Sequence, residues 1–417
     1  MRRLLFACLL LCASTVAVSQ LLPPLQIRNQ QFFAGARPFA FQGLNWFGFN
    51  NKQTMVDGLW AGGSSAATDF STIVESIRLL GYNSIRLPFV FSDLQMSTID
   101  KSHPCKILAD SAVVARCKAK SPPYSLYKWL PRPKSNVCNA YLPRGKTEDR
   151  FLWVIQKFID NGFYVVIDYH PMGTEDHPYN VIKFVNAWKS LWTRITNLPD
   201  YYTKIAGRIL IDIMNEPDSM SLSWPRTAEL YLRTMDALYP IGNRTAFFLV
   251  EGTGQTNYYM NWGDGFVTNT TVINKFGLSD PTTFFKQVVW KPYVDRVIIS
   301  PHVYGPSISQ AKLAYSGKDM FNRLDISFGY LYKKGYCQGG KCTKFAVIIG
   351  EFGSKFEDPR DLEHLNDFSH WMKKTFARPS WLFWAYNQNS GDTGGIVKNN
   401  WQDIDWRKVN WLRQNMI

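Results

Sequence analysis

Residues 209–217 read Ile-Leu-Ile-Asp-Ile-Met-Asn-Glu-Pro, an apolar run that ends in Asn215 and Glu216. A short run that is apolar almost throughout is typical of a strand in a parallel sheet, because helices cover both faces of such a sheet. Residues 345–350 form another apolar run, and Glu351 follows it directly. The two runs therefore predict two buried parallel strands that each place a glutamate at the carboxyl end.

Six further runs of this kind occur along the chain, separated by stretches with helical periodicity. The eight predicted strands are residues 39–44, 83–88, 163–169, 209–214, 246–250, 296–300, 345–350 and 381–386. A helix before the second strand is expected to begin after Asp69, a candidate N-cap, and to end at Gly81. This alternation predicts an α/β fold, a single (β/α)8 TIM barrel. An open dinucleotide-binding sheet is disfavoured, because no Gly-x-Gly-x-x-Gly follows the first strand.

The length of 417 residues exceeds the ~250 residues of a minimal barrel. Much of the excess lies in residues 92–146, which are rich in proline and contain Cys105, Cys117 and Cys138. This stretch predicts a long loop inserted after the second strand. Residues 1–19 combine two arginines with a short apolar run and predict a secretory signal peptide rather than a membrane anchor. The catalytic domain is then expected to span residues 20–417.

Export from the cell permits disulfides. Cys337 and Cys342 flank the short turn Gln-Gly-Gly-Lys and predict one disulfide, whereas the pairing of the other three mature cysteines stays open. Asn243-Arg-Thr and Asn269-Thr-Thr are glycosylation sequons. We therefore expect a secreted glycoprotein, extracellular or in a cell wall, and a monomer.

The net charge of +14 is dispersed, because like-charged runs are no longer than pairs such as Lys333-Lys334. Neither a basic tail nor an RNA-binding signature is present, so no nucleic-acid partner and no membrane partner is expected. His170 and His177 are possible metal ligands, but their loop setting argues against that role, and no cysteine has zinc-site spacing. We expect no metal and no cofactor.

In a (β/α)8 barrel the catalytic groups lie at the carboxyl ends of the strands. Six of the eight predicted strands end in residues suited to sugar chemistry, namely Arg86, His170, Asn215 with Glu216, His302 with Tyr304, Glu351, and Trp384. Two carboxyl groups on opposite sides of the barrel mouth could flank a glycosidic bond. An arginine keeps a carboxylate ionised, an asparagine can bind a sugar hydroxyl, and a tryptophan can stack on a sugar ring. The pattern predicts a glycosidase.

These residues resemble the hallmark residues of glycoside hydrolase family 5, the large cellulase family of retaining (β/α)8 enzymes. The resemblance covers about residues 35–411 and implies that Glu351 is the nucleophile and Glu216 the acid/base. It also implies supporting catalytic roles for the residues Arg86, His170, Asn215, His302 and Tyr304. The strings Asn45-Trp-Phe-Gly-Phe49, Gly58-Leu-Trp60 and Ser390-Gly-Asp-Thr-Gly-Gly-Ile396 are similar to secreted endoglucanases of that family. Residues 92–146 have no counterpart in this resemblance.

The expected function is that of a secreted retaining endo-β-1,4-glucanase whose partner is cellulose or a related β-glucan. Candidate substrate-binding residues are Asn45, Trp46, Trp60, Trp262 and Trp384. For Trp46, Trp60 and Trp262, packing in the core is the alternative. β-Mannan, mixed-linkage glucan and β-1,3-glucan remain alternative substrates, and an inactive wall-binding protein is the alternative of a different class.

Overall fold

The computed structural model describes residues 21–59, 68–99, 131, 137–171, 175, 177–309 and 314–417. Eight parallel strands form one sheet in which neighbours follow the chain order. They are β4 (Gln42–Asn45), β5 (Ser84–Phe89), β6 (Tyr164–Tyr169), β7 (Ile209–Asp212), β8 (Phe247–Val250), β9 (Val297–Ile299), β12 (Ala346–Val347) and β13 (Trp381–Phe383). The seam closes where Ile349, just beyond β12, pairs with Trp381 in β13. The fold is therefore the predicted (β/α)8 barrel.

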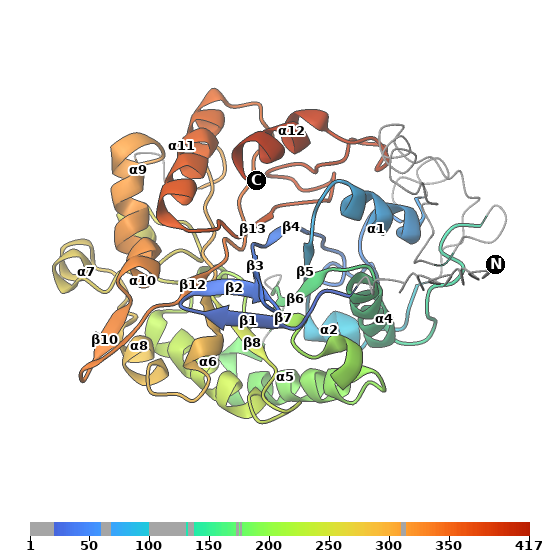
Figure 1. Cartoon of the computed structure of the whole chain (residues 1–417), viewed down its shortest axis with the longest axis horizontal. Coiled ribbons are helices and arrows are strands. Elements are labelled where there is room, and N and C mark those ends of the chain that lie inside the picture. Colours follow the sequence, from blue (N-terminus) through green and yellow to red (C-terminus); the bar gives the residue numbers. More distant parts are fainter. Residues whose placement is uncertain are drawn as a thin grey trace, which may run out of the picture.

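Helices surround the barrel, and Figure 1 shows them as an outer ring. The longer ones are α1 (Phe70–Leu79), α4 (Thr147–Asp160), α5 (Val181–Thr196), α6 (Trp224–Leu238), α11 (Pro359–Thr375) and α12 (Trp406–Asn415). The shorter ones are α2 (Phe91–Leu94), α7 (Thr270–Phe276), α8 (Thr282–Val288), α9 (Gly317–Leu324) and α10 (Tyr330–Lys333). The Asp69 carboxylate caps α1 by accepting from the Ser71 amide, and Gly81 follows the helix with a φ of +101°. Both features agree with the predicted limits of that helix.

A small antiparallel sheet of β1 (Leu25–Arg28), β2 (Gln31–Ala34) and β3 (Arg37–Phe39) precedes the barrel. In Figure 1 it lies across the centre of the barrel, in front of the ring of strands. Its apolar side chains, including Leu25 and Phe32, belong to the same buried cluster as inward-facing barrel residues such as Tyr164 and Leu210. The sheet therefore closes the amino-terminal end of the barrel and leaves the carboxyl-terminal end for the site.

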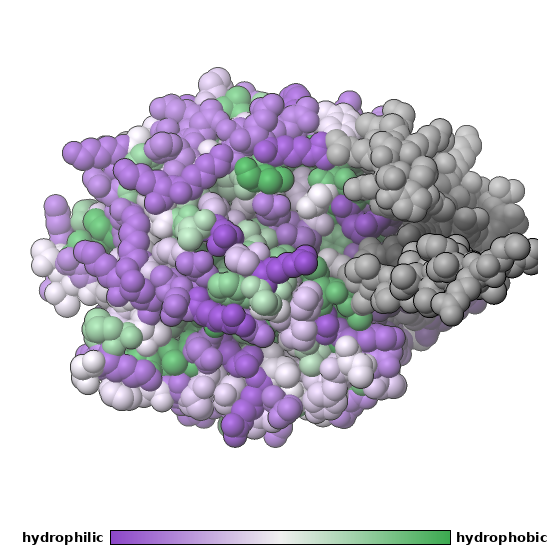
Figure 2. Space-filling model, in the orientation of Figure 1, coloured by the Kyte–Doolittle hydropathy of each residue, from purple (hydrophilic) through white to green (hydrophobic). Residues whose placement is uncertain are grey.

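The face seen in Figure 2 is mostly hydrophilic, with small and separate hydrophobic areas. No helix in the described ranges is long and apolar enough to cross a bilayer. Most of the predicted insertion, and with it Cys105 and Cys117, lies outside the described residues. Its two ends meet in an antiparallel bridge between Ser97 and Lys146, and Cys138 is disulfide-bonded.

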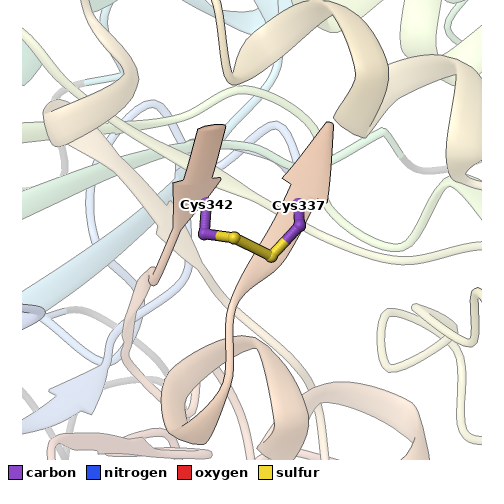
Figure 3. Close-up of a disulfide and its surroundings, with 2 residues drawn as sticks. All are labelled: Cys337 and Cys342. Carbon is purple, nitrogen blue, oxygen red and sulfur yellow. A yellow bond between two sulfur atoms is a disulfide. The ribbon is translucent and has the colours of Figure 1, made fainter. Parts of the chain in front are cut away.

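The predicted disulfide between Cys337 and Cys342 is confirmed. It joins β10 (Tyr336–Gln338) to β11 (Lys341–Thr343), as Figure 3 shows, and the two cysteines are directly opposite each other in the hairpin. The hairpin comes before β12 in the chain, so it lies toward the amino-terminal end of that strand, away from the carboxyl ends of the barrel strands.

We predict that replacing Cys337 and Cys342 together with serine lowers the free energy of unfolding by at most about 2 kcal/mol. A disulfide that closes so short a loop removes little entropy from the unfolded chain. Urea unfolding of the double variant, compared with the oxidised wild-type protein, measures the change. A variant that failed to fold would show that the hairpin contributes far more than loop closure.

Candidate active site

A pocket of about 290 Å³ opens at the carboxyl ends of the barrel strands. Its lining residues come from the ends of six strands and the loops that follow, namely His170, Glu216, Met260, Asn261, Trp262, Tyr304, Ile308, Ser309, Glu351, Trp384 and Asp392. A larger depression of about 880 Å³ lies over the loop after β13. It contains neither strand-end glutamate, so the smaller pocket is the candidate active site.

Arg86, on β5, lies beneath this pocket with no exposed side-chain surface. A buried guanidinium must find acceptors for its five N–H groups. Its carboxylate partners are Asp212 at 2.9 Å, Asp168 at 3.1 Å, Glu251 at 3.1 Å and Glu351 at 2.6 Å. The side-chain oxygens of Asn45 and Asn215 accept two further hydrogen bonds, at 3.0 and 2.9 Å. One cation on β5 thus contacts side chains that come from five other strands of the barrel.

Glu351 follows β12, and both oxygens of its carboxylate are held. Arg86 Nη1 donates to Oε1 at 2.6 Å, and the Tyr304 hydroxyl donates to Oε2 at 2.7 Å. Burial raises the pKa of Tyr304 well above its ordinary value, and the neighbouring Glu351 charge raises it further, so the phenol remains a donor. A carboxylate held by a cation and a hydroxyl is fixed in direction.

Glu216 follows β7 and starts the 3-10 turn η4 (Pro217–Met220). Its backbone is left-handed, with a φ of +37°, a conformation that is costly for a residue with a side chain. The Glu216 amide donates to Glu251 Oε2 at 2.7 Å, which holds this conformation in place. The turn directs the Glu216 side chain, which is 18% exposed, into the pocket.

His302 lies between the two strand-end glutamates. Its Nδ1 is 2.9 Å from Glu216 Oε1 and 3.6 Å from Glu351 Oε2. A carboxylate oxygen of Glu216 and one of Glu351 lie within 4.8 Å of each other. Glu351 is held in place, and Glu216 contacts a proton carrier. Two carboxyl groups at this separation can attack an acetal carbon and protonate its leaving group.

His170 and Trp384 both line the pocket. Their rings stack at 5.4 Å between centroids with an interplanar angle of 17°, and Trp384 donates through Nε1 to Ser390 Oγ at 3.1 Å. His170 Nδ1 contacts Asp168 at 2.8 Å, and the Asn215 amide nitrogen approaches His170 Nε2 at 3.4 Å. These contacts favour the tautomer with the proton on Nδ1. The Trp384–Ala385 peptide bond is cis.

The structure corrects two of the candidate substrate-binding residues. Trp46 is fully buried, donates to the Asp57 carbonyl and packs against Phe70, so it belongs to the core. Asn45 is also fully buried, and its amide group spans Arg86 and the Gly350 carbonyl. Asn45 ends the first barrel strand and Trp46 follows it, and the sequence pattern did not show that both side chains turn away from the pocket.

Of the other two platform candidates, Trp60 lies outside the described residues. Trp262 lines the pocket and is 47% exposed. Together with Trp384 it offers aromatic surface at the pocket.

Three buried acidic residues of this site were missed in the sequence. Asp168 and Asp212 each lie inside a strand, where an acidic residue among apolar neighbours is itself a signal of function. Glu251 follows Val250 at the end of β8, the same pattern that pointed to Glu216 and Glu351. All three are fully buried and contact Arg86.

The charges of the site oppose one another. Burial alone would raise the pKa of Glu216, but the hydrogen bond and charge of His302 outweigh burial and lower it. Burial would lower the pKa of His302, but Glu251, Glu351 and Glu216 outweigh it and hold that pKa well above its ordinary range. Burial raises the pKa of Asp212 to about 6 and that of Glu251 well above its ordinary value. The free site therefore favours an ionised Glu216, while the pair of His302 and Glu251 retains a proton.

Two groups of side chains have donors of the types that bind metal ions. Asp168, Asp212 and Glu251 form one of them, but the Arg86 guanidinium already lies among these carboxylates and neutralises them. Glu216, His302 and Glu351 form the other. There the Glu351 oxygens accept from Arg86 and Tyr304, and the Glu216 oxygen contacts the imidazole. Protein cations or hydrogen-bond donors therefore already contact both groups.

The loop that carries Trp262 is anchored by a buried ion pair. Arg323, on α9, contacts the Asp264 carboxylate at 3.0 Å, and Asn261 donates to the same carboxylate at 3.3 Å. Both charged side chains are buried. Burial raises the pKa of Asp264 to about 7 and lowers that of Arg323, so desolvation outweighs the attraction of the pair for each partner.

We predict that Asp264 makes the protein less stable as the pH rises from about 4 to about 7. Over that range the unfolded chain has already released the Asp264 proton, whose ordinary pKa is 3.8, whereas the folded protein still holds it. Unfolding free energies measured across this range should fall with pH in the wild type and stay flatter in Asp264→Asn. Asp319→Asn, an exposed change on α9, is the control. An equal slope in all three proteins would contradict the prediction.

Comparison with known proteins agrees with this geometry. Residues 133–390 match the family model for cellulase, glycosyl hydrolase family 5. The major extracellular endoglucanase of Xanthomonas campestris pv. campestris is 23% identical over 391 residues, which cover 89% of this chain and 66% of that protein. An endoglucanase of Paenibacillus polymyxa is 25% identical over 404 residues, covering 91% and 82%.

Solved structures show the same fold. An endocellulase from Pyrococcus horikoshii, in complex with cellotetraose, superposes with a TM-score of 0.64 at 22% identity, covering 94% of this chain and 98% of that one. The catalytic domain of the major endoglucanase from Xanthomonas campestris pv. campestris gives a TM-score of 0.62 at 21% identity, covering 94% and 99%. The match to the family model spans more than half of the chain, and the chain is a glycoside hydrolase that belongs to the cellulase family, glycosyl hydrolase family 5.

Proposed function

We propose that the protein is a secreted endo-β-1,4-glucanase that hydrolyses its polysaccharide with retention of configuration. The observation that carries the proposal is the pair of strand-end glutamates, whose oxygens approach within 4.8 Å across the pocket. Retaining glycosidases hold their two carboxyl groups about 5 Å apart, whereas inverting enzymes leave room for a water molecule between them.

In the proposed first step, Glu351 attacks the anomeric carbon while Glu216 gives a proton to the departing oxygen. Glu351 suits the nucleophile because hydrogen bonds from Arg86 and Tyr304 hold both of its oxygens in place. Glu216 suits the proton donor because it is the more exposed carboxyl and contacts His302. In the second step, Glu216 takes a proton from water, which releases the sugar from Glu351.

The proposed substrate is a chain of β-1,4-linked glucose. Trp384 and Trp262 provide aromatic surface in the pocket, and aromatic rings pack well against the apolar faces of glucose units. Both relatives named above are endoglucanases, and a structural neighbour was solved with cellotetraose. Asn215, which donates toward His170 and accepts from Arg86, lies beside Glu216 where it can reach a sugar hydroxyl.

We infer that the protein acts outside the cell as a monomer. Residues 1–19 have the pattern of a signal peptide, and the named relative from Xanthomonas is an extracellular enzyme. The Cys337–Cys342 disulfide and the two glycosylation sequons suit an oxidising, exported environment.

Replacing Glu351 and replacing Glu216 should affect hydrolysis in different ways. Glu351→Ala removes the only proposed nucleophile, so hydrolysis of every substrate should fall by many orders of magnitude. Glu216→Ala should still attack a dinitrophenyl cellobioside, whose leaving group needs little protonation, and should then accumulate the glycosyl-enzyme for want of a base. Azide needs no base, so it should restore turnover and give a β-glycosyl azide. Burst kinetics and product analysis by NMR measure both effects.

Glu363→Ala, an exposed change on α11, is the control and should keep wild-type rates. If Glu351→Ala formed an α-glycosyl azide, the roles of nucleophile and acid/base would be the reverse of those proposed. Full activity of both variants, or a wild-type enzyme that releases no reducing sugar from cellulose, mannan or mixed-linkage glucan, would refute the proposed function.

A further inference from the structure

Glu251, His302 and Glu216 form a continuous row of titratable groups. His302 Nε2 lies 3.2 Å from Glu251 Oε1, and His302 Nδ1 lies 2.9 Å from Glu216 Oε1. The first contact does not meet hydrogen-bond geometry, so proton transfer across it requires Glu251 or His302 to reorient. The imidazole therefore connects a buried carboxyl to one that faces the substrate pocket.

The inner end of this row is closed to water. Glu251 and His302 have no exposed surface. Gly263 covers them, since a Cβ at that position would lie 2.8 Å from Glu251 Oε2 and 3.2 Å from His302 Cγ. Glycine is required there also because its φ is +82°. A proton on Glu251 therefore cannot exchange directly with solvent, and its route to the pocket passes through His302.

The row answers a difficulty of the proposed mechanism. An acid catalyst must begin the reaction protonated, yet the surroundings of Glu216 favour its ionised form in the free enzyme. The groups that face His302 are all acidic, namely Glu216, Glu251 and Glu351. Glu251 in turn faces Arg86, which cannot release a proton at these pH values.

Of the three carboxyl groups that face His302, Glu251 is the one that has no exposed surface and does not line the pocket. Its other contacts are the Glu216 amide, which donates to Oε2, and the nearby carboxylates of Asp212 and Asp168. Repulsion by these two carboxylates and burial both oppose a negative charge on Glu251. A proton is therefore stored more readily on the inner part of the row than on Glu216.

We propose that Glu251 is a positioning residue that supplies the catalytic proton to Glu216 through His302. The step begins with a neutral His302 that carries its proton on Nδ1, and Glu251 Oε1–H gives its proton to His302 Nε2 as His302 Nδ1–H gives its proton to Glu216 Oε1. One O–H and one N–H bond break, one N–H and one O–H bond form, and no charge leaves the row. When Glu216 later takes a proton from water, the same two transfers run in reverse. This inference rests on the proposed role of Glu216 as the acid/base.

The test compares Glu251→Gln with the wild type on two substrates. Cellotetraose has a poor leaving group and needs the proton, whereas dinitrophenyl cellobioside does not. We expect kcat/KM to fall roughly 10-fold to 100-fold for cellotetraose but to change by less than about 3-fold for the dinitrophenyl substrate. The pH above which cellotetraose hydrolysis declines should fall by about one unit, because the row loses the buried carboxyl that stores its proton.

Glu75→Gln is the matched control, since Glu75 is a fully buried glutamate paired with Arg78 on α1, away from the pocket. It should leave both rate constants and the pH profile unchanged. If Glu251→Gln fails to fold, Glu251→Asp provides the same comparison, because it keeps the carboxyl but withdraws it from His302. If the role of Glu251 is merely structural, kcat/KM should fall by the same factor for both substrates and the pH profile should not move. That result would overturn the relay.

The two proposals fail separately. Hydrolysis of cellotetraose that survives in Glu216→Ala would remove the proposed function and the relay with it. The relay alone would be refuted if the wild type is active and depends on Glu216 while Glu251→Gln keeps the wild-type pH profile. In that case the ratio of kcat/KM for the two substrates would also be unchanged in Glu251→Gln.

Discussion

A guanidinium buried without exposed surface is tolerated only where anions surround it, because removing a charge from water costs several kcal/mol. Arg86 meets this condition with four carboxylates that come from β6, β7 and the residues after β8 and β12. Asn45 on β4 and Asn215 after β7 complete its acceptors. The position of Glu351, and through Glu251 the backbone of Glu216, depend on this one cation.

The arrangement of charges also limits which groups of the site can be ionised at the same time. Arg86 contacts four of the carboxyl groups described here, and one guanidinium cannot balance four negative charges. Not every carboxyl can therefore be ionised, and burial raises the pKa of Asp212 to about 6. The proton that remains must lie on a group that can release it toward the pocket. His302 has one nitrogen toward Glu216 and the other toward Glu251, so it is the only contact of Glu216 in this network that can both accept and give a proton.

Much of this could be predicted from the sequence, because strands of a parallel barrel are apolar on both faces and their ends are marked by polar residues. Glu216, Glu351 and Arg86 stand out for that reason. Asn45 and Trp46 were wrongly predicted to bind substrate, because the direction of a side chain at the end of a strand depends on local backbone geometry. The sheet of β1, β2 and β3 was not predicted, since its strands are short and only partly buried. The role of Glu251 depends on the close approach of Gly263 and His302, which are distant in the chain.

The central claim is that Glu351 becomes covalently bonded to the sugar while Glu216 exchanges protons. The most direct measurement is mass mapping of the enzyme after inactivation by a dinitrophenyl 2-deoxy-2-fluoro-β-cellobioside, whose fluorine slows release of the glycosyl-enzyme more than its formation. We predict a single added disaccharide on the peptide that contains Glu351. A label on the Glu216 peptide, or rapid turnover to a product of inverted configuration with no label, would contradict the account.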